Sequence, residues 1–237
     1  MVAAYVRELH RLFSTDRLDR YRPAGADDLT MVVTYLWNVQ LCEALYPSLC
    51  ALELTLRNTI HLTLTAHFNN RAGWYDVPGL LQRDESRQLT SVKSSIQAAG
   101  KPLLPGRVIA GVSFGFWTGL LSGLYGNSPK GPQLWMSPNS PLLAAAFPHA
   151  PVTHQPYRSR IHDRFDVLRK LRNRVFHYES IYDDPVLLQK HADMIDAIGW
   201  VSPTIQASTV SLDRFPHVYR FGQRHIRRRL KQDLGIS

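Results

Sequence analysis

The sequence has no long run of apolar residues. Its most apolar stretch, Val108–Leu124, is interrupted by four glycines and by polar residues. It therefore falls short of the roughly 18 uninterrupted apolar residues that a membrane-spanning helix needs. Charged residues between Arg7 and Arg11 stand where a secretory signal peptide would have its apolar core. We therefore expect a soluble, cytoplasmic protein with no membrane partner.

Cysteine and metal-ligand patterns are also scarce. The two cysteines, Cys42 and Cys50, flank a proline in a helical region, and two buried thiols in a reducing cytosol are favoured over a single disulfide. His149, His154 and His162 have no cysteine or carboxylate at ligand spacing, so we expect no metal and no cofactor. A phosphate-binding glycine-rich loop with a following Lys-Ser or Lys-Thr is missing, so nucleotide hydrolysis is not expected.

Acidic residues are outnumbered by basic ones. The chain has 28 lysines and arginines against 19 aspartates and glutamates, a formal charge of +9, and an isoelectric point near 9.8. No acid occurs from Phe215 through Gln232, where six lysines and arginines occur. Such an excess favours a polyanionic partner, with nucleic acid ahead of an anionic membrane surface.

Alternating patterns typical of strands are nearly absent, whereas apolar residues recur at helical spacing. We therefore predict an all-α fold, in a single domain over residues 1–237. The 44% of hydrophobic residues suffices for a substantial core. Helices are expected over residues 2–13, 28–47, 80–99, 108–124, 157–178, 185–199 and 215–231. A further helix is expected from residue 47 onward, where Pro47 either opens a new helix or kinks the preceding one. The region 100–156 is rich in proline and glycine, and 127–141 is expected to be a long loop.

The segment from Leu168 to Glu179 suggests a chemistry. Arg172 lies at the margin of an apolar helical seam, and Asn173 and His177, four residues apart, share a helix face. An imidazole, with an ordinary pKa of about 6.5, can exchange protons near neutrality, and a guanidinium can stabilise charge on a phosphate. We interpret this as metal-independent RNA cleavage, with Asn173 orienting either group. The alternative is a solvated helix face whose histidine caps the last carbonyl groups.

The run from Arg172 to His177 resembles the Arg-x4-6-His motif of HEPN ribonucleases, including the asparagine that often follows the arginine. Further segments are similar to the Abi-like (AbiD/AbiF) phage-defence family, and the likeness extends from about residue 30 to 200. These segments are Tyr35-Leu36-Trp37-Asn38, Leu41 to Pro47, Leu52 to Asn58, Ser113 to Trp117 and Ile198-Gly199-Trp200.

This resemblance implies a HEPN-like helical bundle, with peripheral helices, in which the motif helix lines a cleft. It implies a homodimer whose composite site cuts RNA, with Arg172 and His177 catalytic and Asn173 supporting. Arg174 adds a cation inside the motif and is expected to bind RNA. A role in phage defence or as a toxin follows from the family, and a toxin would call for an antitoxin partner.

Two further groups are candidates for RNA binding. Arg57 and Asn58 either support the His177 site or, as the alternative, Arg57 forms a surface ion pair with Glu53. On the basic C-terminal helix, residues 215–231, phosphate contact is expected for Arg224, Arg227 and Arg228, and a merely solvated face is the alternative.

Two other functions remain to be distinguished from RNA cleavage. A non-catalytic protein that binds a structured or small noncoding RNA would need the same basic surface but not His177. A serine hydrolase is suggested by Gly111-Val112-Ser113-Phe114-Gly115, but that motif needs a preceding strand and a parallel sheet, which the sequence does not indicate.

Overall fold

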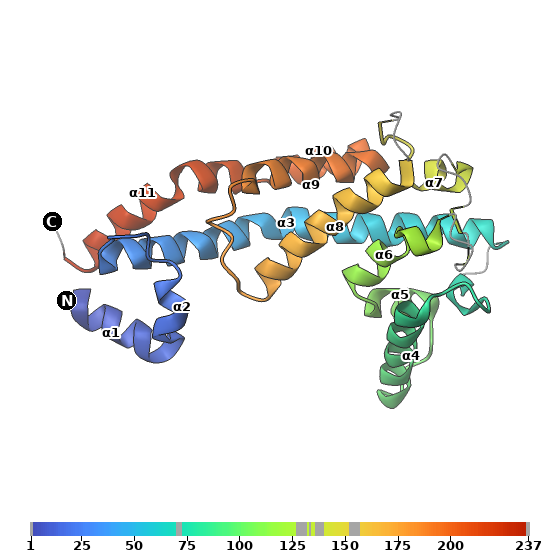
Figure 1. Ribbon diagram of the computed structural model, residues 1–237, viewed down its shortest axis with the longest axis horizontal. Helices are drawn as coiled ribbons and strands as arrows, with labels where there is room; N and C mark the ends of the chain where they lie inside the picture. Colours follow the sequence, from blue (N-terminus) through green and yellow to red (C-terminus); the bar gives the residue numbers. More distant parts are fainter. Residues whose placement is uncertain are drawn as a thin grey trace. The chain divides into compact units, whose positions relative to one another are not determined.

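The computed structural model describes residues 2–69, 73–126, 132, 134–135, 140–151 and 157–235. Every regular element in these residues is a helix, which confirms the predicted all-α class (Figure 1). No helix among them has the length and apolar character needed to cross a membrane. In chain order the elements are α1 (Val2–Phe13), α2 (Thr15–Asp19), α3 (Asp28–His67), η1 (Trp74–Asp76), α4 (Arg83–Ala98), α5 (Pro105–Gly111), α6 (Phe114–Gly119), η2 (Gly123–Tyr125), α7 (Pro141–Ala146), α8 (Tyr157–Phe176), α9 (Leu187–Val201), α10 (Pro203–Ser211) and α11 (Phe215–Asp233).

Helix α3 is a single helix of 40 residues with Pro47 in its interior, so a new start at Pro47 is wrong. Proline removes one backbone donor and leaves the carbonyl four residues earlier without its helical bond. Leu45 and Leu49 on either side are at most 1% exposed, and their packing maintains the helix across this defect. The predicted start is confirmed, because the Asp27 carboxylate accepts a hydrogen bond from the Thr30 amide at 2.8 Å.

The chain divides into two compact units. The first comprises Met1–Leu49, Leu171–Ala192 and Ser211–Ser237, and the second comprises Cys50–Lys170 and Asp193–Val210. Both cysteines are free, as favoured from the sequence. Cys42 is half-buried, and burial raises its pKa to about 11. Cys50 is exposed, which corrects the expectation that both thiols are buried.

The core of the first unit brings together its two ends. Apolar side chains of α1, α2, the start of α3 and the end of α11 form one buried cluster, made of Val6, Leu18, Tyr21, Met31, Val32, Val33, Ile226 and Leu230. Earlier in α11 the backbone at Gly222 approaches α3, and a Cβ atom there would lie 2.6 Å from Cδ1 of Trp37. The Trp37 indole donates a hydrogen bond to the Val218 carbonyl at 3.0 Å. The two helices are therefore in close contact at the glycine.

The core of the second unit is aromatic. The Trp74 and Trp117 rings meet edge to face at 6.3 Å, and the Trp74 indole donates to Nδ1 of His61 at 3.1 Å. A single helix over 108–124 is wrong, because the chain breaks after α5 and restarts as α6. The Ser113 hydroxyl caps this restart by accepting from the Phe116 amide at 3.3 Å.

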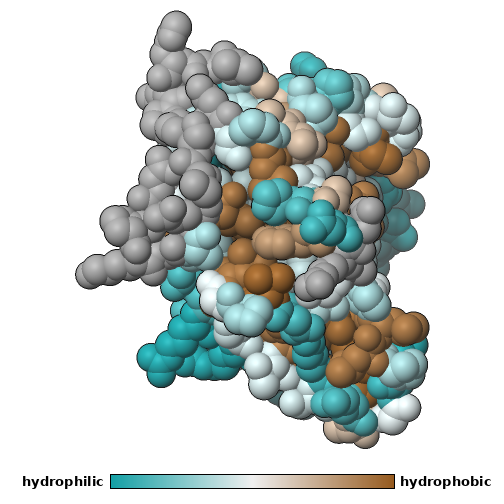
Figure 2. All heavy atoms as spheres, turned by 90° about the vertical axis from the view of Figure 1, so that its right-hand side faces the viewer, coloured by the Kyte–Doolittle hydropathy of each residue, from teal (hydrophilic) through white to brown (hydrophobic). Residues whose placement is uncertain are grey.

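The surface of the structure mixes apolar and hydrophilic residues. On the face drawn in Figure 2, apolar residues (brown) gather in several patches among hydrophilic ones (teal). Most of the predicted loop at 127–141 lies outside the described residues, and so does His154. Helix α10, which the sequence did not indicate as a separate element, follows α9 after a single residue.

Candidate functional site at the end of helix α8

Helix α8 ends earlier than predicted, and this determines where His177 lies. The last helical residue is Phe176, and Tyr178 adopts a left-handed conformation with φ of 58°. The Tyr178 amide donates to the Val175 carbonyl at 3.3 Å, and the Glu179 amide donates to the Arg174 carbonyl at 2.9 Å. This is a Schellman ending with tyrosine where glycine is usual. His177 is therefore the first residue beyond the helix.

The apolar seam predicted for α8 is confirmed, and Arg172 lies at its margin as expected. Ile161, Phe165 and Leu168 are at most 1% exposed, whereas Arg172 is half-buried. Its guanidinium carbon lies 4.1 Å from the centre of the Phe176 ring, a cation–π contact one turn further along the helix. The guanidinium is thereby directed toward the helix end at which His177 follows.

The ring that the Arg172 guanidinium contacts belongs to an exposed aromatic pair. The centres of the Phe176 ring and of the Tyr46 ring on α3 are 6.1 Å apart. Phe176 is 40% exposed and Tyr46 is 57% exposed. Tyr178, on the other side of His177, is 73% exposed. The two residues that flank His177 in the sequence are thus both exposed aromatics.

His177 itself is exposed. Within the described part of the chain, no hydrogen bond involves its ring, and the last carbonyls of α8 are satisfied by backbone amides instead. Capping of these carbonyls by the imidazole, the alternative interpretation, is therefore not observed. The His177 amide bonds to the Asn173 carbonyl at 2.9 Å, which places Asn173 one turn before the imidazole.

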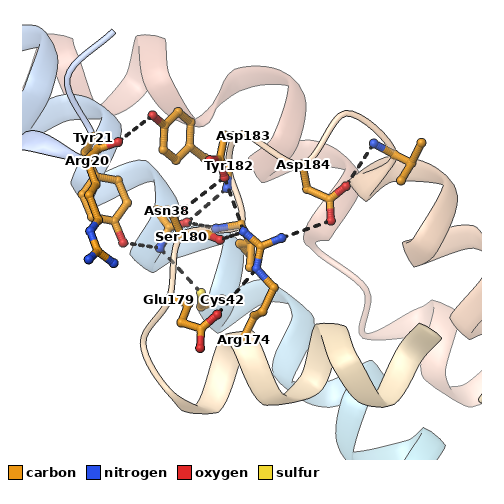
Figure 3. A network of polar contacts seen from close by, with 12 residues as sticks. Arg20, Tyr21, Asn38, Cys42, Arg174, Glu179, Ser180, Tyr182, Asp183 and Asp184 are labelled. Carbon is orange, nitrogen blue, oxygen red and sulfur yellow. Dashed lines mark hydrogen bonds and ion pairs between the residues drawn. The ribbon is translucent and has the colours of Figure 1, made fainter. Parts of the chain in front are cut away.

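Arg174 has internal partners in the segment that follows α8 (Figure 3). Its guanidinium nitrogens lie 3.9 Å from the carboxylate of Glu179 and 3.5 Å from those of Asp183 and Asp184, and one nitrogen donates to the Ser180 carbonyl. Binding an RNA phosphate through Arg174 would require loss of these contacts.

The acid at the centre of this network is well compensated. The Asp184 side chain is 5% exposed and lies 2.6 Å from the Lys190 ammonium. Burial alone would raise the pKa of Asp184, but Lys190, a backbone amide and Arg174 outweigh burial and lower it. The carboxylate is therefore a structural anion that anchors the segment after α8.

Asn38 on α3 holds the same segment, a role that no local sequence pattern predicts. Its side chain is buried, and its carbonyl oxygen accepts from the amides of Ile181 at 2.7 Å and Tyr182 at 3.2 Å. Its amide group donates to the Tyr21 hydroxyl at 3.3 Å (Figure 3). The Tyr182 hydroxyl donates to the carbonyl of Arg20 at 3.0 Å. These bonds fix the chain immediately after the proposed catalytic residue.

Arg57 and Asn58 lie on the part of α3 that belongs to the second unit. Asn58 is exposed, and Arg57 is half-buried with its Nε atom lacking a hydrogen-bond partner. An unsatisfied donor on a half-buried guanidinium is available to a ligand.

The basic helix α11 presents its cations on the face opposite its buried residues. Arg220, Arg224 and Arg228 recur at spacing four and are exposed. Within the described residues, Arg224 and Arg228 have no ion-pair partner. Arg227 is half-buried and donates to the Thr30 hydroxyl at 3.0 Å, so of the three arginines expected to contact RNA it is the least available.

No strand precedes Ser113 in the described residues, and the hydroxyl of this serine caps α6. The setting that a nucleophilic serine needs is thus missing there. In the same residues, no group of three or more His, Cys, Asp or Glu side chains is placed to bind a metal ion.

No protein-family model, no curated protein and no solved structure matches the chain. The likeness to Abi-like and HEPN proteins rests on the motifs quoted from the sequence, and it stays a prediction.

Proposed function

We propose that this protein is a metal-independent endoribonuclease of the HEPN type, with its reacting centre at the end of α8. The observation that carries this proposal is the exposed imidazole of His177 at the same helix end toward which the Phe176 ring directs the Arg172 guanidinium. The basic face of α11 supports RNA as the substrate.

The reaction needs two proton transfers and stabilisation of charge. The ribose 2′-oxygen attacks the adjacent phosphorus, its proton is removed, and the bond from phosphorus to the 5′-oxygen breaks as that oxygen gains a proton. His177 performs one of these transfers, which contributes about 10²- to 10⁴-fold in rate. Arg172 stabilises the charge that develops on the phosphate, in the manner of an oxyanion-hole donor.

Asn173 completes the group by orienting His177 or the phosphate from one turn earlier. The resemblance to HEPN proteins implies a homodimer, in which a second copy of His177 would make the other proton transfer. It also implies a role in phage defence or as a toxin restrained by an antitoxin, and we expect this action in the cytoplasm, as the composition indicates.

The test is RNA cleavage by pure protein in EDTA. His177→Ala should lose about 10²-fold or more of the cleavage rate. Arg172→Lys, which keeps the charge but loses the planar fork, should lose most of it. The matched controls His67→Ala and Arg87→Lys change exposed residues of the second unit and should cut at the wild-type rate. Equal cleavage by all five proteins would contradict the proposal.

A non-catalytic RNA-binding protein is the second candidate. The exposed arginines of α11 favour this candidate, because they could bind RNA without any contribution from His177. RNA that is retained by wild type and by His177→Ala, but cut by neither with or without metal, would support this candidate over the first.

A further inference from the structure

The first unit contains a groove between α3 and α11 that has no part in the proposed cleavage site. Its volume is about 240 Å³, and its walls include Glu43 of α3 and, on α11 and just before it, Arg214, His217, Phe221, Gly222 and His225. At Gly222 the two helices are so close that a Cβ atom would collide with the Trp37 indole.

One wall of the groove is a row of flat rings. His217, Phe221 and His225 follow each other at spacing four on α11, so they lie along one line of the helix. The rings of His217 and Phe221 have their centres 5.2 Å apart, and Phe221 is 41% exposed. An exposed apolar ring at the edge of a groove is suited to stacking against another flat group.

A row of cations runs directly beside these rings. Arg220, Arg224 and Arg228 each come three residues after one of the rings, so they form the neighbouring row on the helix surface. The Arg220 guanidinium lies 5.1 Å from the Phe221 ring centre. At one end of the groove the Arg214 guanidinium donates to the Glu43 carboxylate at 2.8 Å. Flat rings bordered by uncompensated arginines offer both the stacking surface and the charge that single-stranded nucleic acid requires.

We propose that this groove binds an unpaired nucleotide of an RNA strand. The base stacks on Phe221 between the two histidines, and the neighbouring phosphates contact Arg220, Arg224 and Arg228. The groove is smaller than the roughly 300–1,000 Å³ of sites for drug-sized ligands, which suits one base rather than a larger molecule. Paired bases cannot reach the rings, so the groove selects single-stranded segments. This inference rests on RNA being the partner, as in the proposed function.

The experiment measures binding of full-length protein carrying His177→Ala, so that RNA stays intact. The probes are a fluorescent single-stranded RNA of about ten nucleotides and a duplex of the same length. Phe221→Leu keeps an apolar side chain but removes the ring. It should weaken single-strand binding by about 5- to 140-fold, the range for loss of one stacked base, and change duplex binding by less than about twofold.

Two further variants separate stacking from a change in the fold. Phe221→Trp keeps an aromatic face and should bind the single strand as tightly as the parent. Phe13→Leu alters a phenylalanine of similar exposure, 42%, that does not line the groove, and it should have no effect.

Unchanged single-strand binding by Phe221→Leu overturns the groove proposal but leaves RNA as a partner. An equal loss for duplex and single strand also overturns it. If the parent binds neither probe, RNA is not the partner, and the proposed function fails together with this inference.

Discussion

Replacing Asn38 by alanine would remove the acceptor that the segment after α8 depends on. The side-chain oxygen accepts from two backbone amides, at Ile181 and Tyr182, and the side-chain amide donates to the Tyr21 hydroxyl. Ile181 is fully buried, so water cannot replace its lost partner. A buried polar group left unsatisfied costs about 1–3 kcal/mol. With one buried and one partly buried amide affected, we expect a loss of about 2–4 kcal/mol in the stability of this segment.

The assay is amide hydrogen exchange followed over residues 178–186. A loss of about 2 kcal/mol corresponds to exchange that is roughly 30-fold faster at the affected amides, at tenfold for each 1.4 kcal/mol. RNA cleavage should fall while RNA binding persists, because the segment positions His177 and the basic face of α11 is untouched.

Thr34→Val is the matched control on the same helix. Thr34 is also buried, but its hydroxyl donates at 2.9 Å to the carbonyl of Thr30, which is already engaged within the helix. Its loss leaves no orphaned group and should cost less than about 1 kcal/mol. Unchanged exchange in Asn38→Ala, or an equal change in both variants, would refute the reasoning.

Three further predictions concern other parts of the first unit. Burial lowers the pKa of His191 despite the Asp213 carboxylate 2.9 Å away. The unfolded chain, with an ordinary histidine pKa of about 6.5, therefore binds the proton first. Stability to urea should fall as the pH drops below about 6.5, and less steeply in His191→Gln. Gly222→Ala should lose about 1–3 kcal/mol through overpacking, measured by thermal unfolding. Arg224→Ala with Arg228→Ala should reduce the slope of log affinity for RNA against log salt by about 2.

His67→Gln changes an exposed histidine, and its stability to urea should fall with acid as much as that of the wild type. If the stability of His191→Gln fell just as steeply, the prediction for His191 would be wrong. In Gly106→Ala, a substitution in α5, the added Cβ atom would have no other atom within 4 Å. It should be neutral or stabilising, so a loss equal to that of Gly222→Ala would argue against overpacking. An unchanged salt slope would mean that the α11 arginines do not contact phosphate.

Helices with a regular apolar period were predicted well. The effects of proline and glycine inside a helix were not: α3 continues past Pro47, whereas the glycine-rich segment 108–124 is interrupted. Helix α1 begins and ends at Val2 and Phe13, as expected. Pro47 was expected to open or kink a helix, and the new start is wrong: α3 continues as one helix past Pro47, with buried leucines on both sides of it. The glycines of 108–124 were expected within a helix, but the chain breaks at Ser113, whose hydroxyl begins a new one. Whether a proline or glycine ends a helix depends on tertiary packing, which the local sequence does not reveal.

The candidate site was predictable where it is local and not where distant residues meet. The apolar seam of α8 and the marginal position of Arg172 follow from helical spacing. The partners of Arg174 do not, because the acids approach it only after the chain turns at Tyr178. The role of Asn38 depends on a contact across 143 residues, which no local pattern reveals. The groove beside α11 likewise depends on the close approach of two helices from opposite ends of the chain.

The ends of the RNA fragments that wild-type protein produces in EDTA distinguish metal-independent cleavage by His177 from other reactions. We expect fragments with a 2′,3′-cyclic phosphate and a 5′-hydroxyl, and almost none from His177→Ala. Fragments with a 3′-hydroxyl and a 5′-phosphate, cleavage that EDTA abolishes, or equal cleavage by His177→Ala would contradict this expectation.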